Sequence, residues 1–133
     1  NAVLAAERFR PELLEEFESA IDQQIAEDAI GADGDRVFHM LVAEATGNRA
    51  LVAMTHYLWE QMQYSHMWKR LIEHAQLSGL YPIILDDHRG LLDALSRRDS
   101  ESARNIMEDH LKHAQEIFFS LVNYEAKNGS SDK

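Results

Sequence analysis

The sequence DRVFH at residues 35–39 is the most informative stretch of the chain, because it places a carboxylate and an imidazole four residues apart. In a helix, Asp35 and His39 leave the same face, one turn apart. Each has an ordinary explanation. Asp35 near a helix start favours the helix dipole, and a histidine beside Phe38 is commonly a hydrogen-bonded core residue. The pair becomes informative when further ligand-type residues join it.

The rest of the chain predicts helices rather than strands. Only two prolines and six glycines occur, and they fall between stretches whose apolar residues recur every three to four positions. We therefore expect one all-α domain over residues 1–133, an antiparallel bundle of about six helices that encloses a pocket for a metal and a ligand. Because the chain begins inside a helical pattern, we expect this domain to be slightly truncated at its N-terminus.

Several residues predict where helices begin. Pro11 and Pro82 suit first turns, and Asn48 and Asp99 are expected N-caps. The helix after Asn48 is expected to break near residues 65–68. It carries apolar residues at helical spacing: Leu51, Met54, Leu58 and Met62. We expect Met54, Met62 and Met67 to fill the core.

Composition excludes several classes of function. The formal net charge is −10, so this chain by itself is poorly suited to bind nucleic acid or an anionic membrane. The absence of cysteine removes disulfides, thiolate metal sites and cysteine nucleophiles. No apolar run reaches the roughly 20 residues of a membrane helix. We expect a cytoplasmic protein without a membrane partner.

Two later histidines extend the pair at residues 35–39. Leu91 and Leu92 follow His88 at helical spacing, and His110 lies among apolar neighbours, so both imidazoles are expected to point inward. Buried polar groups without partners are unfavourable, and one shared cation satisfies a carboxylate and three imidazoles together. Spacing alone leaves a metal site and separate core roles equally open.

Familiar enzyme motifs are missing. There is no HExxH, no ExxH, no glycine-rich phosphate loop and no recognisable Ser/His/Asp order. A metal centre of this composition could also activate water, so a metal-dependent hydrolase or other small enzyme is the alternative function. Glu60 and Asp87 are the candidate general bases. The remaining histidines, His56, His66, His74 and His113, are expected to face water.

The order of several short motifs resembles the effector-binding FCD domain of GntR-type transcription regulators, FadR subfamily, from about Pro11 to Leu121. They are DxxFH at 35–39, EATGN at 44–48, HxxxLxAL at 88–95, DxxxA at 99–103 and MxxHL at 107–111. The resemblance implies a divalent metal bound by one aspartate and three histidines: Asp35, His39, His88 and His110. We expect zinc, with nickel or manganese as alternatives.

The resemblance also implies a sensor rather than an enzyme. In that family a small organic acid completes the coordination of the metal, the domain forms a homodimer, and an N-terminal winged helix-turn-helix binds operator DNA. That head is absent from this sequence, as is the start of the first effector-domain helix, where the family often has an arginine for the effector.

Two tryptophan-containing stretches look most like regulators of hexuronate use: LWEQ at 58–61 and MWKRL at 67–71. We also expect Gln61 and Trp68 to bind the ligand, because they lie on the long middle helix and at its break, within reach of the pocket. Trp59 and Trp68 equally suit core or dimer contacts. The sequence thus predicts the ligand-sensing domain of a transcriptional repressor that binds a sugar acid such as a hexuronate at its metal.

Overall fold

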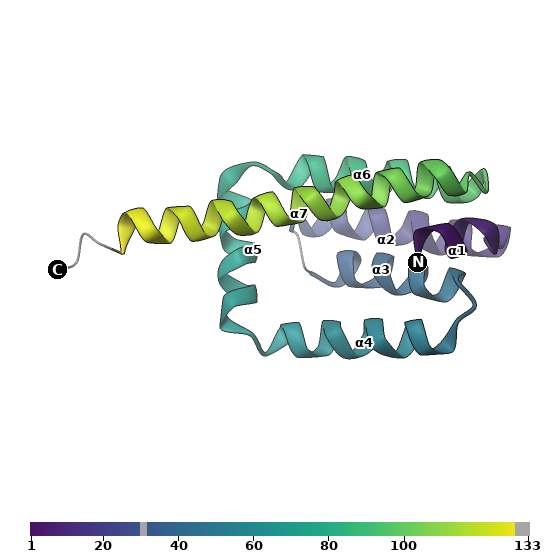
Figure 1. Ribbon diagram of the computed structural model, residues 1–133, viewed down its shortest axis with the longest axis horizontal. Helices are drawn as coiled ribbons and strands as arrows, with labels where there is room; N and C mark the ends of the chain where they lie inside the picture. The colour runs from purple at the N-terminus through teal and green to yellow at the C-terminus, as the bar shows by residue number, and fades with distance from the viewer. Residues whose placement is uncertain (30–31, 130–133) are drawn as a thin grey trace.

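The computed structural model describes residues 1–29 and 32–129, and every regular element in these ranges is helical (Figure 1). The elements are α1 (Ala2–Glu7), the 3₁₀ helix η1 (Pro11–Leu13), α2 (Leu14–Glu27), α3 (Asp33–Ala45), α4 (Arg49–Gln63), α5 (His66–Ser78), α6 (Tyr81–Ser96) and α7 (Ser100–Asn128). The all-α prediction is confirmed. The described part has seven α-helices rather than about six, because α4 and α5 separate fully at residues 64–65.

Neighbouring helices run antiparallel in two hairpins. α2 pairs with α3, α6 pairs with α7, and α1 lies against α7. α4 runs beside α3 at the edge of the bundle, and α5 crosses from α4 to α6 (Figure 1). This arrangement brings α3, α6 and α7 together, and each carries one of the predicted metal-binding histidines. None of the helices in the described ranges is both long and apolar enough to cross a membrane.

Side-chain caps fix the helix starts where the sequence predicted them. Asn48 Oδ1 accepts from the backbone N–H groups of Ala50 and Leu51. Asp99 Oδ1 accepts from the N–H of Ser102 at the start of α7. Such caps satisfy amide groups that have no partner inside the helix. The predicted helix starts at Asn48 and Asp99 are confirmed.

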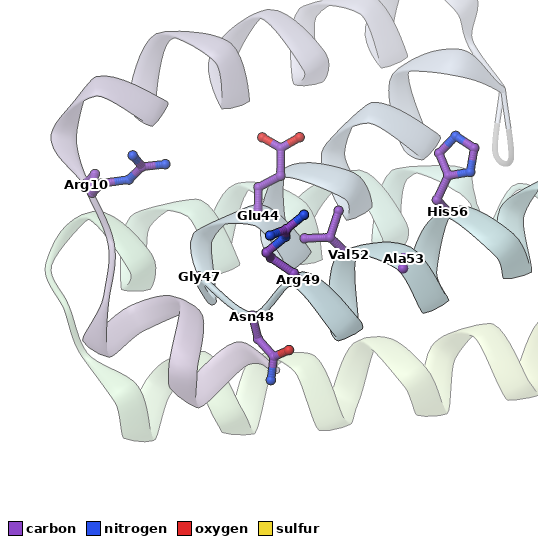
Figure 2. Close-up of a pocket in the computed structure, with 8 residues that line it drawn as sticks. All are labelled: Arg10, Glu44, Gly47, Asn48, Arg49, Val52, Ala53 and His56. Atoms are coloured by element: carbon purple, nitrogen blue, oxygen red, sulfur yellow. The ribbon is translucent and has the colours of Figure 1, made fainter.

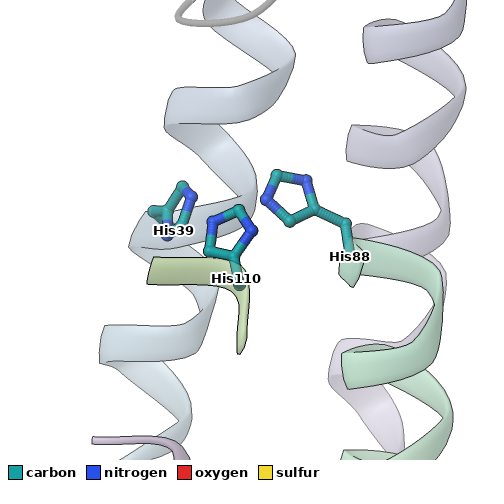
Figure 3. A group of neighbouring side chains, drawn as sticks. All are labelled: His39, His88 and His110. Atoms are coloured by element: carbon teal, nitrogen blue, oxygen red, sulfur yellow. The ribbon is translucent and has the colours of Figure 1, made fainter. Parts of the chain in front are cut away.

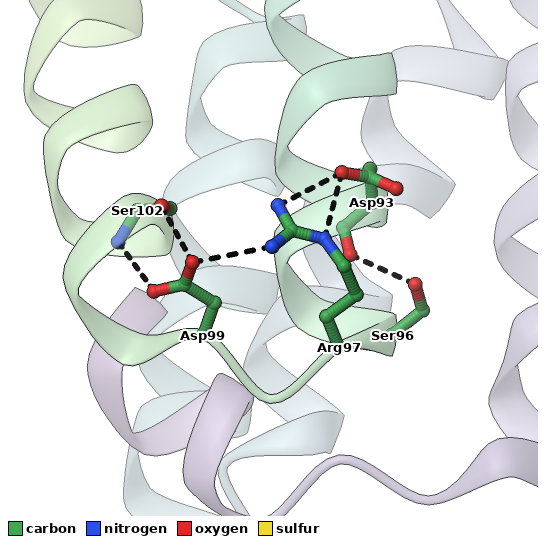
Figure 4. Close-up of polar contacts among 5 residues, drawn as sticks. All are labelled: Asp93, Ser96, Arg97, Asp99 and Ser102. Carbon is green, nitrogen blue, oxygen red and sulfur yellow. Dashed lines mark hydrogen bonds and ion pairs between the residues drawn. The ribbon is translucent and has the colours of Figure 1, made fainter.

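Two consecutive arginines hold the α6–α7 turn in place, and Figure 4 shows the contacts of the first, Arg97. Arg97 contacts the carboxylate of Asp93 at 2.9 Å through Nη2 and that of Asp99 at 3.3 Å through Nη1. The next residue, Arg98, has φ +55° and donates from Nη2 to the backbone oxygen of Phe9 at 2.9 Å. The turn therefore fixes α6 and α7 relative to each other and to the loop after α1.

A chain of aromatic rings runs through the core toward the histidines. Phe9 and Phe17 have ring centroids 6.1 Å apart, and Phe17 meets Phe38 edge-on at 5.4 Å. Phe38 in turn stacks on the imidazole of His88 at 4.2 Å. Phe17, Phe38 and His88 are fully buried. The apolar core thus ends directly against an imidazole ring.

The stripe expected on α4 does not face the core throughout. Met54 is 60% exposed and Leu58 is 56% exposed, and Tyr57 between them is also exposed. Trp59 is the buried residue of this helix. Because α4 lies at the edge of the bundle, only part of its circumference has neighbours within the chain. The prediction that the methionines fill the core is wrong at Met54 and at Met67, which is exposed on α5.

One close approach between α2 and α3 controls the position of Gln24. A Cβ atom on Gly34 would lie 2.6 Å from the backbone nitrogen of Gln24 and 2.8 Å from its Cγ. We predict that Gly34→Ala lowers the free energy of unfolding by about 1–3 kcal/mol, because the added methyl overpacks this contact. Chemical denaturation measures the change.

Gly90→Ala is the matched control. Its added Cβ would meet Ile106 at 3.6 Å, an ordinary contact, and it gains up to about 1 kcal/mol of helix propensity. Equal stability of the two variants would contradict the close approach of α2 and α3.

Candidate metal centre and its cavity

Three histidines from three helices converge in the core (Figure 3). His39 on α3, His88 on α6 and His110 on α7 each offer one ring nitrogen, and these nitrogens all lie within 4.8 Å of one another. His88 and His110 are buried, and His39 is half-buried. His39 and His110, which are 71 positions apart in the sequence, thus belong to one cluster of potential metal ligands.

Asp35 lies against two of these rings. Its Oδ1 atom is 3.2 Å from Nε2 of His39 and 3.7 Å from Nε2 of His88. The Asp35 side chain is buried, which leaves it little hydration from bulk solvent. All four residues that the sequence singled out thus lie together: the histidines as one cluster, and the carboxylate beside His39 and His88.

A buried amide holds His88. Nδ1 of His88 is 3.0 Å from Oε1 of Gln24, a fully buried residue of α2. Since the amide oxygen only accepts, Nδ1 carries the proton and Nε2 keeps its lone pair. Nε2 is buried and has no hydrogen-bond partner among the described residues. An electron-pair acceptor such as a metal ion suits this atom.

A carboxylate holds His110 in the same way. Oδ2 of Asp87 is 3.3 Å from Nδ1 of His110 and 2.7 Å from Nδ1 of His113. The proton on Nδ1 leaves Nε2 of His110 available as a ligand. The hydrogen bond to Asp87 raises the pKa of His113. The His113 side chain is about one-third exposed, whereas the sequence predicted that it faces water. Asp87 therefore orients one ligand and anchors a neighbour.

Burial keeps the inner rings neutral. Desolvation is the largest cause that lowers the pKa of His88 well below its ordinary value, and the nearby His39 adds to the effect. Desolvation also lowers the pKa of His110, again with a contribution from His39. Neutral imidazoles are the form that binds metal ions. Three imidazole nitrogens and a carboxylate oxygen fit a divalent transition metal.

Gln24 and Asp87 hold two of the candidate ligands, a role that was not predicted for either residue. Gln24 falls three residues after Ile21 and seven after Phe17, so it is a polar residue on an apolar helical stripe. That pattern could have marked it. Asp87 follows Asp86 and resembles a surface carboxylate, so only the fold reveals its contacts.

A small cavity opens beside the cluster, with a volume of about 170 Å³. Its polar lining comes from Asp35, His39 and His110, and the rest is mainly aromatic and aliphatic. The other lining residues are Trp59, Trp68, Leu71, Ile72, Ala75, Ile84, Leu111, Ala114 and Ile117. Trp68 thus reaches the cavity. Gln61 is exposed on α4 and is not part of the lining, so this geometry gives its expected role no support.

A larger, open groove lies elsewhere, near the α3–α4 turn (Figure 2). Its volume is about 660 Å³, and its lining includes Arg10, Glu44, Arg49 and His56. The side chains are spread along the groove, and none of them belongs to the histidine cluster. Size alone therefore does not make this groove the candidate metal site, because it lacks the cluster of potential ligand atoms.

The chain matches a known family of protein domains. The family model for the FCD domain matches residues 1–113, which include all four candidate ligands. The chain belongs to the FCD domain family. The resemblance drawn from the short motifs is confirmed, and the match begins earlier than Pro11 and ends at residue 113.

Curated relatives of this FCD chain are named as transcriptional regulators. The Uxu operon transcriptional regulator of Escherichia coli (strain K12) is 31% identical over 104 residues, which cover 77% of this chain and 40% of that protein. The Exu regulon transcriptional regulator of the same strain is 36% identical over 88 residues, 66% of this chain and 34% of that protein. The Uxu operon regulator of Haemophilus influenzae is 30% identical over 99 residues, 74% of this chain and 36% of that protein.

The FCD chain therefore spans between about one-third and two-fifths of the length of these relatives. No solved structure matches it significantly.

The contact between Gln24 and His88 makes a direct prediction about metal affinity. We expect Gln24→Leu to weaken zinc binding about 10- to 100-fold, since outer partners of metal-bound histidines contribute this much. Competition with a zinc-sensitive dye measures the affinity.

Gln23→Leu is the matched control, because Gln23 is the exposed neighbour on the same helix. Equal zinc affinity in the two variants would show that Gln24 does not position His88.

Proposed function

We propose that this FCD chain is the ligand-sensing part of a cytoplasmic transcriptional repressor, and that it binds a small organic acid such as a hexuronate beside a divalent metal, with zinc expected first. One observation carries the proposal: three imidazoles from three helices form one cluster, and two of them, His39 and His110, line a small cavity. Membership of the FCD family and the regulator names of the relatives support it.

The metal would be held by Asp35, His39, His88 and His110. Bound there, it would supply positive charge for an acid's oxygen atoms. Four protein donors leave free positions on a metal that accepts five or six ligands, whereas a purely structural site is closed. His39 and His110, together with Asp35, line the cavity, so the free positions are expected on that side.

The cavity favours a small ligand with an apolar side. Its volume of about 170 Å³ is below the range of roughly 300–1,000 Å³ that is usual for drug-sized ligands. Trp59 and Trp68 meet edge to face with ring centroids 5.9 Å apart and line the same cavity. Indole rings offer flat apolar surfaces to the C–H face of a sugar acid.

Ligand binding would be transmitted through the helices that carry the site. Because the four donors lie on α3, α6 and α7, a small change at the centre acts on three packed elements at once. We assign operator binding to a separate winged helix-turn-helix region, as the resemblance implies. With a net charge of −10, the FCD chain is itself poorly suited to contact phosphates.

The alternative, a hydrolase, lacks support from either candidate base. Oδ2 of Asp87 is engaged by His110 and His113 and does not face the cavity. Glu60 is exposed, and its nearest ionic partner is the exposed His56 at 3.8 Å. A hydrolase at this centre requires a base within reach of bound water. Neither residue provides one.

The proposed function predicts that acid binding depends on the metal. Protein purified without chelator should contain roughly one metal ion per chain. Calorimetric titration should then detect a hexuronate, and chelation or His39→Ala should abolish the signal. His56→Ala should retain both metal and ligand, because His56 lies exposed on α4. A hexuronate that binds equally well to metal-free protein would contradict the proposal.

We also propose that the chain forms a homodimer through the exposed face of α4. This face presents Met54, Tyr57 and Leu58 to solvent, next to the buried Trp59. Three large apolar residues within five positions are more than isolated surface hydrophobics, and such patches commonly mark interfaces. A second copy that covers this face would remove the patch from water.

The dimer proposal is tested by light scattering. Leu58→Glu is expected to shift the chain from dimer to monomer, because a buried unpaired charge at an interface is unfavourable. Leu77→Glu on α5 is the control, since Leu77 is exposed outside the α4 face. A wild-type monomer, or two variants with equal mass, would exclude this interface.

A further inference from the structure

A second hollow lies directly outside the metal-side cavity. Its volume is about 330 Å³, and it shares Trp59, Trp68 and Ile72 with the inner cavity. The remaining lining residues are Ala32, Asp33, Arg36, Gln63 and Lys69. The three shared side chains therefore form a partition, with the histidines on one side and two cationic residues on the other. We call the second hollow the outer cleft.

The cations of the outer cleft are weakly neutralised. Nε of Arg36 is buried without a hydrogen-bond partner, and the nearest ionic contact is Oδ1 of the exposed Asp33 at 3.8 Å. Lys69 makes no ion pair with any residue in the described ranges. A buried guanidinium donor without an acceptor is unfavourable, and an anion supplies the acceptor. The two side chains thus suit a carboxylate.

The backbone N–H groups at the start of α3 are not available to bind an anion. The backbone N–H groups of Asp33 and Gly34 already donate to the carboxylate of Glu27, at 3.1 and 2.9 Å. Any attraction of the outer cleft for an anion therefore rests on the side chains of Arg36 and Lys69.

We propose that Arg36 and Lys69 form an anion-receiving subsite through which a carboxylate ligand reaches the inner cavity. The inference rests on the proposed function, and it adds the route and the residues that select for an acid. A chain with a net charge of −10 repels acids at long range, and a cationic cleft raises their local concentration. From there the ligand passes the partition of Trp59, Trp68 and Ile72.

The two tryptophans of the partition provide a fluorescence signal for ligand entry. Trp59 and Trp68 are the two tryptophans of the chain, and both line the inner cavity and the outer cleft. Passage of a ligand between them changes the surroundings of both indoles. Stopped-flow tryptophan fluorescence with metal-loaded protein and D-galacturonate or D-glucuronate therefore measures the association rate constant.

The expected result is a rate effect that salt removes. Arg36→Gln should lower the association rate constant on the order of threefold to tenfold at low ionic strength, because steering by charge acts on association. The difference from wild type should shrink near 1 M salt, where the screening length is about 3 Å. Lys69→Gln should act in the same direction. Zinc affinity, measured without acid, should stay unchanged in both variants.

Arg104→Gln is the matched control, because Arg104 is an exposed cation on α7 paired with Glu108, outside both hollows. If Arg36→Gln and Lys69→Gln bind acid at the same rate as Arg104→Gln, the subsite is excluded while the proposed function stands. If metal-loaded wild type gives neither a fluorescence nor a calorimetric response to either acid, both the hexuronate proposal and this subsite fail.

Discussion

The structure depends on burying several imidazoles side by side in an apolar core. His88 shows the constraint. One face of its buried ring stacks on Phe38, and both of its ring nitrogens still need polar partners. The outer nitrogen is satisfied by Gln24, and a carboxylate does the same for His110. The inner nitrogens then face each other and Asp35. Helices α2, α3, α6 and α7 must therefore meet in one relative position for the polar atoms of the core to be satisfied.

Much of the fold and of the candidate ligand cluster could be predicted because both depend on short-range spacing. Asp35 and His39 share a face whenever their segment is helical, and His88 and His110 each follow from apolar neighbours at helical positions. Helix starts at Asn48 and Asp99 were equally predictable, since a cap needs only a few consecutive residues. These inferences required no knowledge of which helix lies beside which.

What the sequence missed depends on tertiary neighbours. Asp87 looked like a surface residue, and its contacts with two histidines exist only because α6 lies antiparallel to α7. Met54 looked like core filler, but the edge position of α4 leaves it exposed. Gln61 was expected near the ligand from its place on the long middle helix, and a shift of a few residues around a helix decides whether a side chain faces a cavity.

The turn at residues 97–99 has a consequence for how this site tolerates change. It joins α6, which carries His88, to α7, which carries His110. Arg97 pairs with carboxylates before and after it in the chain, and Arg98 donates to the backbone after α1. One added or deleted residue in α7 before His110 would move that imidazole along the helix by about 1.5 Å and turn it by about 100°. The number of residues between His88 and His110 therefore matters to the centre as much as their side chains do. Substitutions in this segment are expected to be tolerated better than insertions or deletions.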